Sequence, residues 1–207
     1  MTCWTCTPSY APSRVSSSTS ETGLGEQLAD LLWGDPYRIR CLQAVQVLPV
    51  TGAWIGAGFV RSLVWDAAAG IRTELDDVDV LWFQADEDRG QDAVLEGMLR
   101  SVLPDVPWSV RNQARMHDRN GDAPYRSVVH AMEHWPETAT AVAVRLDEDG
   151  ALDVLAPFGL TDLFGLRVRP TPYMVSRADR RAVFAGRSVS KRWEARWPGV
   201  VVEHPPL

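Results

Sequence analysis

Asp77 and Asp79 are the residues of this chain whose type and spacing most directly indicate chemistry. They lie in the segment Leu75-Asp-Asp-Val-Asp-Val-Leu-Trp-Phe83, whose apolar residues predict a strand. Since side chains alternate between the two faces of a strand, both carboxylates point the same way. Two like charges on one face repel each other unless a cation lies between them. Mg²⁺ takes carboxylate oxygens and leaves positions open for substrate phosphates, so the pair predicts a magnesium site.

Gly56 and Gly58 precede this strand in Ala53-Trp-Ile-Gly-Ala-Gly-Phe-Val-Arg61 and predict a turn between a short strand and a helix. Glycine lets the backbone approach a phosphate closely, and the N-terminus of a helix attracts anions. The turn and the aspartates together therefore predict transfer of a nucleotidyl group. Each feature also has a simpler interpretation: a tight turn for the glycines, and a solvated strand face for the aspartates.

Two further charged side chains could complete such a site. Asp153, between apolar neighbours in Leu152-Asp-Val-Leu155, is costly to bury unless it is paired or binds a metal. Chemistry with two metals takes carboxylates from more than one strand, so Asp153 is a candidate third metal ligand or proton acceptor. Arg61, one turn into the predicted helix, could reach a donor phosphate. An exposed hairpin carboxylate and a helix-surface arginine are the competing interpretations.

A polar cluster is predicted on the strand from Trp108 to Met116 and its end, where apolar residues would be less costly to bury. We expect it to line the pocket for the acceptor or for the base of the nucleotide. Hydrogen bonding to the loop from Asp118 to Pro124 is the competing interpretation. The cluster consists of Asn112, Gln113, Arg115 and His117.

A rival reaction class is suggested by His130-Ala-Met-Glu-His134, which fits the H-x-x-E-H pattern of zinc peptidases, with Glu133 activating water. Five residues match easily by chance, and Trp135-Pro136 predicts that the helix ends at or before His134. No third ligand stands out downstream, so zinc hydrolysis is a remote alternative.

The elements that position these residues follow from local signals. Asp35-Pro36 predicts a helix start, Gly70 a helix end, and Asp149-Gly150 a hairpin turn. Helices are expected at 24–32, 36–48, 59–69, 91–103, 127–134 and 177–196, and strands at 54–55, 75–83, 108–116, 140–146, 152–156 and 200–203. The pattern predicts an α+β fold with a mixed sheet flanked by helices and a basic C-terminal helix.

Composition bounds the setting. The chain has 207 residues, of which 45% are hydrophobic, and this suits one domain over residues 23–207 after a Ser/Thr/Pro-rich disordered tail over 1–22. No run is long and apolar enough to predict a membrane span. Three cysteines make no disulfide framework, so we expect a cytoplasmic protein.

The charge is uneven. The net charge of −6 makes bulk binding of nucleic acid improbable, yet residues 167–196 carry nine basic and two acidic side chains. A solvated helix face is the favoured interpretation of this run. The alternative is that these basic side chains form a surface that attracts a polyanionic substrate.

Several strings together resemble a known family. Ile55-Gly-Ala-Gly58 with Asp77-Val-Asp79 resembles the glycine turn and Asp-x-Asp of the polymerase-β-like nucleotidyltransferase superfamily. Further strings resemble a small bacterial nucleotidyltransferase family within it, and the resemblance covers roughly Leu24 to the C-terminus. They are Ala57-Gly-Phe-Val-Arg61 with Val64-Trp-Asp66, Trp108-Ser-Val-Arg-Asn-Gln-Ala-Arg-Met-His117, Trp135-Pro-Glu-Thr-Ala-Thr140 and Leu155-Ala-Pro-Phe-Gly-Leu160.

The resemblance implies a mixed sheet with flanking helices, Mg²⁺ as cofactor, and an NTP donor such as ATP. It implies transfer of a nucleoside monophosphate to a hydroxyl acceptor with release of pyrophosphate, but it does not name the acceptor. This chain departs from the superfamily pattern in two ways. It has Gly-Ala-Gly where the pattern usually has Gly-Gly or Gly-Ser, and the gap from Gly58 to Asp77 is longer than the pattern usually shows. A non-catalytic, nucleotide-binding regulatory or antitoxin-like module is the main alternative, since such a module needs only the glycine turn.

Overall fold

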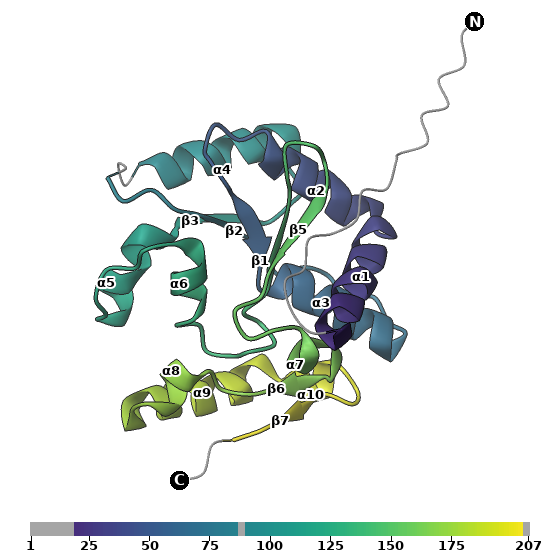
Figure 1. Cartoon of the computed structure of the whole chain (residues 1–207), viewed down its shortest axis with the longest axis vertical. Helices are drawn as coiled ribbons and strands as arrows, with labels where there is room; N and C mark the ends of the chain where they lie inside the picture. The colour runs from purple at the N-terminus through teal and green to yellow at the C-terminus, as the bar shows by residue number, and fades with distance from the viewer. Residues whose placement is uncertain (1–18, 87–89, 205–207) are drawn as a thin grey trace, which may run out of the picture.

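The computed structural model describes residues 19–86 and 90–204, and its centre is a five-stranded mixed sheet (Figure 1). The strands lie in the order β3-β2-β1-β4-β5. The β2·β3 pair is parallel and the other neighbours are antiparallel, which confirms the predicted mixed sheet. Their bounds are β1 Trp54–Gly56, β2 Val78–Trp82, β3 Trp108–Asn112, β4 Ala143–Leu146 and β5 Leu152–Leu155.

One face of the sheet carries the main hydrophobic core. Alternate residues of β2, namely Val78, Val80 and Trp82, are buried in this core together with residues of the first four helices. Those helices are α1 Thr19–Trp33, α2 Pro36–Gln46, α3 Gly58–Ala69 and α4 Gln91–Val102. The predicted helix start at Asp35-Pro36 and helix end at Gly70 are confirmed. The Asp35 side chain accepts hydrogen bonds from the first turn of α2, and Gly70, with φ 64°, ends α3.

The opposite face is covered by a shorter helix, α6 (Val128–Met132), which follows the 3₁₀ turn Gln113–Arg115 and α5 (Met116–Asn120). Val128 and Met132 of α6 form a second, smaller core with Leu81 of β2 and Ala143 of β4. Trp135, just after α6, packs against this core. Asp79 points to the same face as Leu81, because the two are separated by one residue on a strand.

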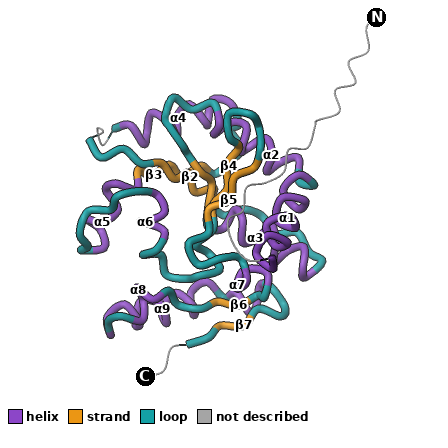
Figure 2. The backbone as a smooth tube through the Cα atoms, viewed as in Figure 1, coloured by secondary structure: helices purple, strands orange, loops and turns teal. Residues whose placement is uncertain are grey.

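The C-terminal part runs beneath the sheet and α6 as a layer of short elements around one long basic helix (Figure 2). The helix predicted over 177–196 is present, but Arg192, with φ 49°, divides it. The elements are α7 Thr161–Phe164, β6 Arg167–Val168, α8 Pro172–Val175, α9 Ala178–Lys191, α10 Trp193–Arg196 and β7 Val201–Val202, with β6 and β7 paired in parallel.

Most predicted element boundaries differ from the structure by one to three residues, and two are wrong by more. Residues 19–22, assigned to the tail, belong to α1, where both carboxylate oxygens of Glu21 accept hydrogen bonds from the start of α7. Residues 1–18 lie outside the described residues. The strand predicted over 108–116 stops at Asn112, because the Asn112 side chain accepts a hydrogen bond from the Ala114 N–H and caps a 3₁₀ turn. Within 19–86 and 90–204, no helix is long and apolar enough to cross a bilayer.

Candidate active site

Asp79 lies near the start of β2 and is half-buried, whereas Asp77 is exposed and directly precedes the strand, which starts at Val78 and not at Leu75 as predicted. Asp79 is flanked on both sides, by Gly56 of β1 and Ser109 of β3 in the strand register. Burial raises the pKa of Asp79 to about 6, and the negative charge of Asp77 adds to the rise. A hydrogen bond from Ser109 and the charges of Arg111 and Lys191 partly oppose it. The two carboxylates therefore interact, and the neighbouring cations do not fully compensate their charge.

The glycine turn approaches this pair from the β1 side. A β-carbon added to Gly58 would lie 3.7 Å from Asp77 Oδ1 and 3.7 Å from Arg61 Nη2. Gly58 is the first residue of α3, so the unpaired N–H groups of that helix start beside Asp77. Ala57, the residue before it, has φ 54° and ψ −124°, a conformation that is strained for any residue with a β-carbon.

Gly56 has a packing reason to be glycine. A β-carbon there would lie 3.1 Å from Leu81 Cδ1, 3.1 Å from the Val142 carbonyl oxygen and 3.2 Å from Ala143 Cβ. Strand β1 therefore fits between β2 and β4 only without a side chain at this position. Contact of Gly56 with a phosphate stays a prediction.

Arg61 is buried, unlike the surface arginine of the competing interpretation. Its guanidinium carbon lies 5.3 to 5.8 Å from three indole ring centroids. Nη1 donates to Thr140 Oγ1 at 3.2 Å, whereas Nε has no hydrogen-bond partner in the described structure. Burial lowers the pKa of Arg61 to about 10, which leaves the side chain cationic at neutral pH. The rings belong to Trp65, Trp193 and Trp197.

Asp153 is on a strand, as predicted, but the structure does not bring it to the aspartate pair. β5 is separated from β2 by β1 and β4, so three strand spacings of ~4.8 Å place it ~14 Å away. Its carboxylate accepts hydrogen bonds from Arg145 Nε and Nη2 at 2.9 and 2.8 Å. No three His, Cys, Asp or Glu side chains within 19–86 and 90–204 are grouped as a metal site. Asp153 therefore lies outside the candidate site.

The four polar residues at the end of β3 and directly after it have different roles. Asn112 bridges strand ends through the backbone of Gln84, and Arg115 pairs with Asp92 at 2.7 Å. His117 contacts Asp118 at 3.1 Å, in agreement with the competing interpretation for that residue. Gln113 alone of the four lines a pocket, between α5–α6 and α8–α9.

The histidines of the zinc pattern are held by backbone contacts. His134 Nδ1 lies 2.7 Å from the carbonyl oxygen of His130, and His130 Nδ1 accepts a hydrogen bond from the N–H of Arg126. α6 ends at Met132, before either Glu133 or His134, and the described residues provide no third ligand nearby. The zinc alternative therefore has no structural support.

The basic run is largely neutralised. Six of its nine cations form ion pairs with carboxylates, and among these Arg187 pairs with the fully buried Glu137 at 2.7 Å. Lys191, at the end of α9, is close enough to Asp79 to affect its pKa. The six are Arg167, Arg169, Arg177, Arg180, Arg187 and Arg196.

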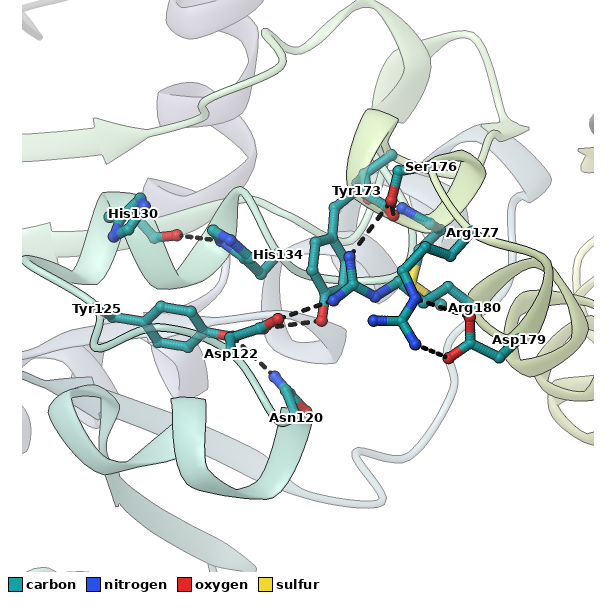
Figure 3. A network of polar contacts seen from close by, with 12 residues as sticks. Asn120, Asp122, Tyr125, His130, His134, Tyr173, Ser176, Arg177, Asp179 and Arg180 are labelled. Carbon is teal, nitrogen blue, oxygen red and sulfur yellow. Dashed lines mark hydrogen bonds and ion pairs between the residues drawn. The ribbon is translucent and has the colours of Figure 1, made fainter.

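Ser109 and Lys191 were not predicted as neighbours of Asp79, because both contacts depend on how strands and helices pair across the chain. A network centred on Asp122 was not predicted either: its carboxylate accepts hydrogen bonds from the hydroxyls of Tyr125 and Tyr173 at 2.7 and 2.8 Å (Figure 3). Asp122 occurred in the sequence only as a loop residue, and no local pattern marked it.

The mixed sheet thus carries two interacting carboxylates beside a glycine turn and a helix N-terminus. A family model described as nucleotidyltransferase matches residues 43–202, which is most of the chain. The protein belongs to this nucleotidyltransferase family.

Solved structures show the same fold. An NMR structure described as a CCA-adding enzyme head domain has a TM-score of 0.78 and 28% identity, covering 87% of this chain and 96% of that chain. A CCA-adding enzyme with CTP has a TM-score of 0.55 and 15% identity, covering 87% of this chain. The Thermotoga maritima CCA-adding enzyme complexed with tRNA has a TM-score of 0.53 and 17% identity, covering 85% of this chain. This chain spans only 43% and 42% of those last two chains. No curated protein matches it significantly.

Proposed function

We propose that the protein transfers a nucleoside monophosphate from an NTP to a hydroxyl acceptor and releases pyrophosphate, with Mg²⁺ held by Asp77 and Asp79. The observation that carries this proposal is the position of Asp77 and Asp79 beside the glycine turn: a β-carbon on Gly58 would lie 3.7 Å from Asp77 Oδ1, and Asp79 pairs with Gly56 in the strand register. Such a pair fits Mg²⁺, which binds proteins through one or two carboxylates and completes its shell with water and substrate phosphates.

The donor triphosphate would lie at the start of α3. There Gly58 leaves the backbone N–H groups accessible beside Asp77, and an anion gains from the helix dipole. Arg61 adds a positive charge from within the protein, since its Nη2, like Asp77 Oδ1, would lie 3.7 Å from a β-carbon on Gly58. Its unpartnered Nε and its lack of an ion pair in the described structure leave this cation available to balance phosphate charge.

The contribution of the protein's residues to rate would be positioning and charge. When bound, Mg²⁺ would neutralise charge on the transferring phosphate. The aspartates fix the position of the reacting group, while Gly58 and Arg61 hold the leaving pyrophosphate away from the acceptor. Interactions of this kind dominate phosphoryl-type transfer, where the enzyme supplies little covalent chemistry.

The test is thermal stabilisation by each NTP, with and without Mg²⁺, in the wild type, the double variant D77N/D79N, and D153N as a matched control. We expect stabilisation that needs Mg²⁺, is lost in D77N/D79N and persists in D153N. Stabilisation that ignores both Mg²⁺ and the two aspartates would instead favour a non-catalytic nucleotide-binding module. No stabilisation by any NTP in the wild type would contradict the donor site.

A further inference from the structure

A pocket of ≈ 650 Å³ opens between α5–α6 on one side and α8–α9 on the other. This volume is in the range of pockets that bind small molecules. Two residues that line the pocket, Trp135 and Arg187, also lie close to elements of the candidate active site. Trp135 packs on the sheet face that carries Asp79, and Arg187 lies one turn before Lys191 on α9. Arg187 also pairs with Glu137, and the Glu137 carbonyl oxygen accepts a hydrogen bond from the N–H of Thr140. The Thr140 hydroxyl in turn accepts a hydrogen bond from Arg61 beside Gly58, so this wall of the pocket continues to the candidate active site.

Flat rings line this pocket. The guanidinium carbon of Arg180 lies 3.6 Å from the ring centroid of Tyr173. The ring of His134 lies between those of Tyr125 and Tyr173, with centroid distances of 4.7 and 4.6 Å (Figure 3). Hydrogen bonds to Asp122 from the two tyrosines and from Arg180 hold these groups in place. Tyr125 is buried, whereas Tyr173 and Arg180 are partly exposed. A fixed pair of an aromatic ring and a guanidinium group offers a plane on which a nucleobase can stack.

The pocket also has an excess of positive charge. Four arginines line it, and three of them pair with carboxylates, leaving Arg119 without an ion pair in the described part of the chain. An anionic ligand reduces this excess, whereas a cationic one adds to it. The paired groups are Arg177 with Asp179, Arg180 with Asp122, and Arg187 with Glu137.

The position of the pocket separates it from the proposed donor site. Gly58 approaches Asp77 at the start of β2, whereas Gln113 of the pocket follows β3 at the far end of these two parallel strands, since Asp79 pairs with Ser109 and Trp82 with Asn112. In-line displacement at phosphorus places the attacking and leaving oxygens on opposite sides. With pyrophosphate at the glycine turn, the acceptor approaches from the side of the pocket.

We propose that this pocket binds the acceptor, and that the acceptor is a nucleotide, recognised by its planar base and its phosphate. The proposal rests on the proposed function. A hydroxyl oxygen of the bound nucleotide forms a bond to the α-phosphorus of the NTP. The bond from that phosphorus to the β-phosphate oxygen breaks, pyrophosphate leaves, and the hydroxyl proton passes to water. The product is a nucleotide extended by one nucleoside monophosphate.

The test measures binding of AMP, GMP, CMP and UMP by calorimetry, without NTP or Mg²⁺. At least one monophosphate is expected to bind the wild type and D77N/D79N alike. Tyr173→Leu, which removes the ring, should weaken binding about 10-fold or more, whereas Tyr173→Phe, which keeps it, should change binding little. Arg119→Ala should weaken binding of the monophosphate but not of the matching nucleoside. Arg181→Ala is the matched control, because Arg181 donates to the Val175 carbonyl and does not line the pocket.

Failure of this proposal differs from failure of the donor site. No binding of any monophosphate to the wild type would overturn the acceptor assignment even where Mg²⁺ and NTP still stabilise the protein. The assignment would also fail if the monophosphate and the NTP compete for one site, or if Tyr173→Leu weakens NTP binding equally. Those two results would assign the pocket to the base of the donor. Melting temperatures of all variants check that the fold is intact.

Discussion

Gly58 and Asp77 lie side by side: a β-carbon on Gly58 would be 3.7 Å from Asp77 Oδ1. This contact joins the two motifs that the sequence presents separately, the glycine turn and the paired aspartates. The two glycines differ in the room around them. A β-carbon on Gly58 would make only ordinary van der Waals contacts, whereas a β-carbon on Gly56 would lie 3.1 Å from its neighbours, which is too close. Gly58 therefore leaves room for a ligand, and Gly56 leaves room for the sheet.

Gly58→Ala and Gly56→Ala are expected to have opposite effects. The added methyl group of Gly58→Ala fits the fold but projects toward Asp77, so stability should be nearly unchanged while Mg²⁺-dependent stabilisation by NTP decreases. Gly56→Ala forces β1 away from its neighbours and should cost about 1–3 kcal/mol of stability. Urea unfolding and NTP titration measure both quantities. A stable Gly56→Ala variant would contradict the packing argument.

Ala57→Gly should stabilise the protein. The backbone of Ala57, with φ 54° and ψ −124°, costs roughly 1–3 kcal/mol for a residue with a β-carbon. Glycine removes that strain but loses more entropy on folding, by roughly 0.5–1 kcal/mol. The net expectation is a gain of about 1 kcal/mol, measured as a shift of the urea midpoint with the slope unchanged. A loss of stability would show that the turn is not strained.

The pH dependence of stability should report the charge of Asp79. Its pKa is raised from 3.8 to about 6, so the folded protein holds this proton more tightly than the unfolded chain does. The carboxyl therefore lowers stability as the pH rises from about 4 through about 6, and the loss is complete above that range. Asp79→Asn should raise stability by about 1–2 kcal/mol at neutral pH and change it little near pH 4. Thermal melts across this range, without Mg²⁺, measure the effect. An equal gain at both pH values would exclude the electrostatic cause.

Features with a local signal were predictable. Asp35-Pro36, Gly70 and the Asp149-Gly150 hairpin each specify a backbone conformation within a few residues, and the structure has a helix start, a helix end and a hairpin at those places. Asp79 belongs to this class as well, since it lies on the predicted strand, whereas Asp77 directly precedes β2, which starts at Val78 and not at Leu75.

Relationships that depend on strand order were not predictable. The strand that carries Asp153 was predicted, but the sequence does not show that β1 and β4 lie between it and β2. The network around Asp122 joins a loop to α8 and α9, more than 50 residues further along the chain. Such pairings follow from the packing of whole elements, so no short pattern indicates them.

Asp153→Asn tests that strand order in solution. Asp153 pairs with Arg145 on the neighbouring strand, at a partly exposed position, so the substitution should cost at most about 1 kcal/mol. Stabilisation by Mg²⁺ and NTP should be the same as in the wild type, whereas Asp77→Asn should abolish it. A loss with Asp153→Asn as complete as with Asp77→Asn would restore Asp153 to the metal site.

Arg61, which is buried, and Arg187, which is partly exposed, are two arginines with different tasks. Arg187 pairs with Glu137, whose side chain is fully buried, so Arg187→Met leaves a carboxylate without its cation and should cost about 3–5 kcal/mol. Arg61 has no such partner in the described structure and lies among three indole rings, so methionine can replace it with a change of only about 1 kcal/mol. If Arg61 serves the donor triphosphate, Arg61→Met should nevertheless lose most of the stabilisation by Mg²⁺ and NTP. Urea unfolding followed by NTP titration separates the two effects. An Arg61→Met variant that keeps NTP binding would show that this cation serves packing alone.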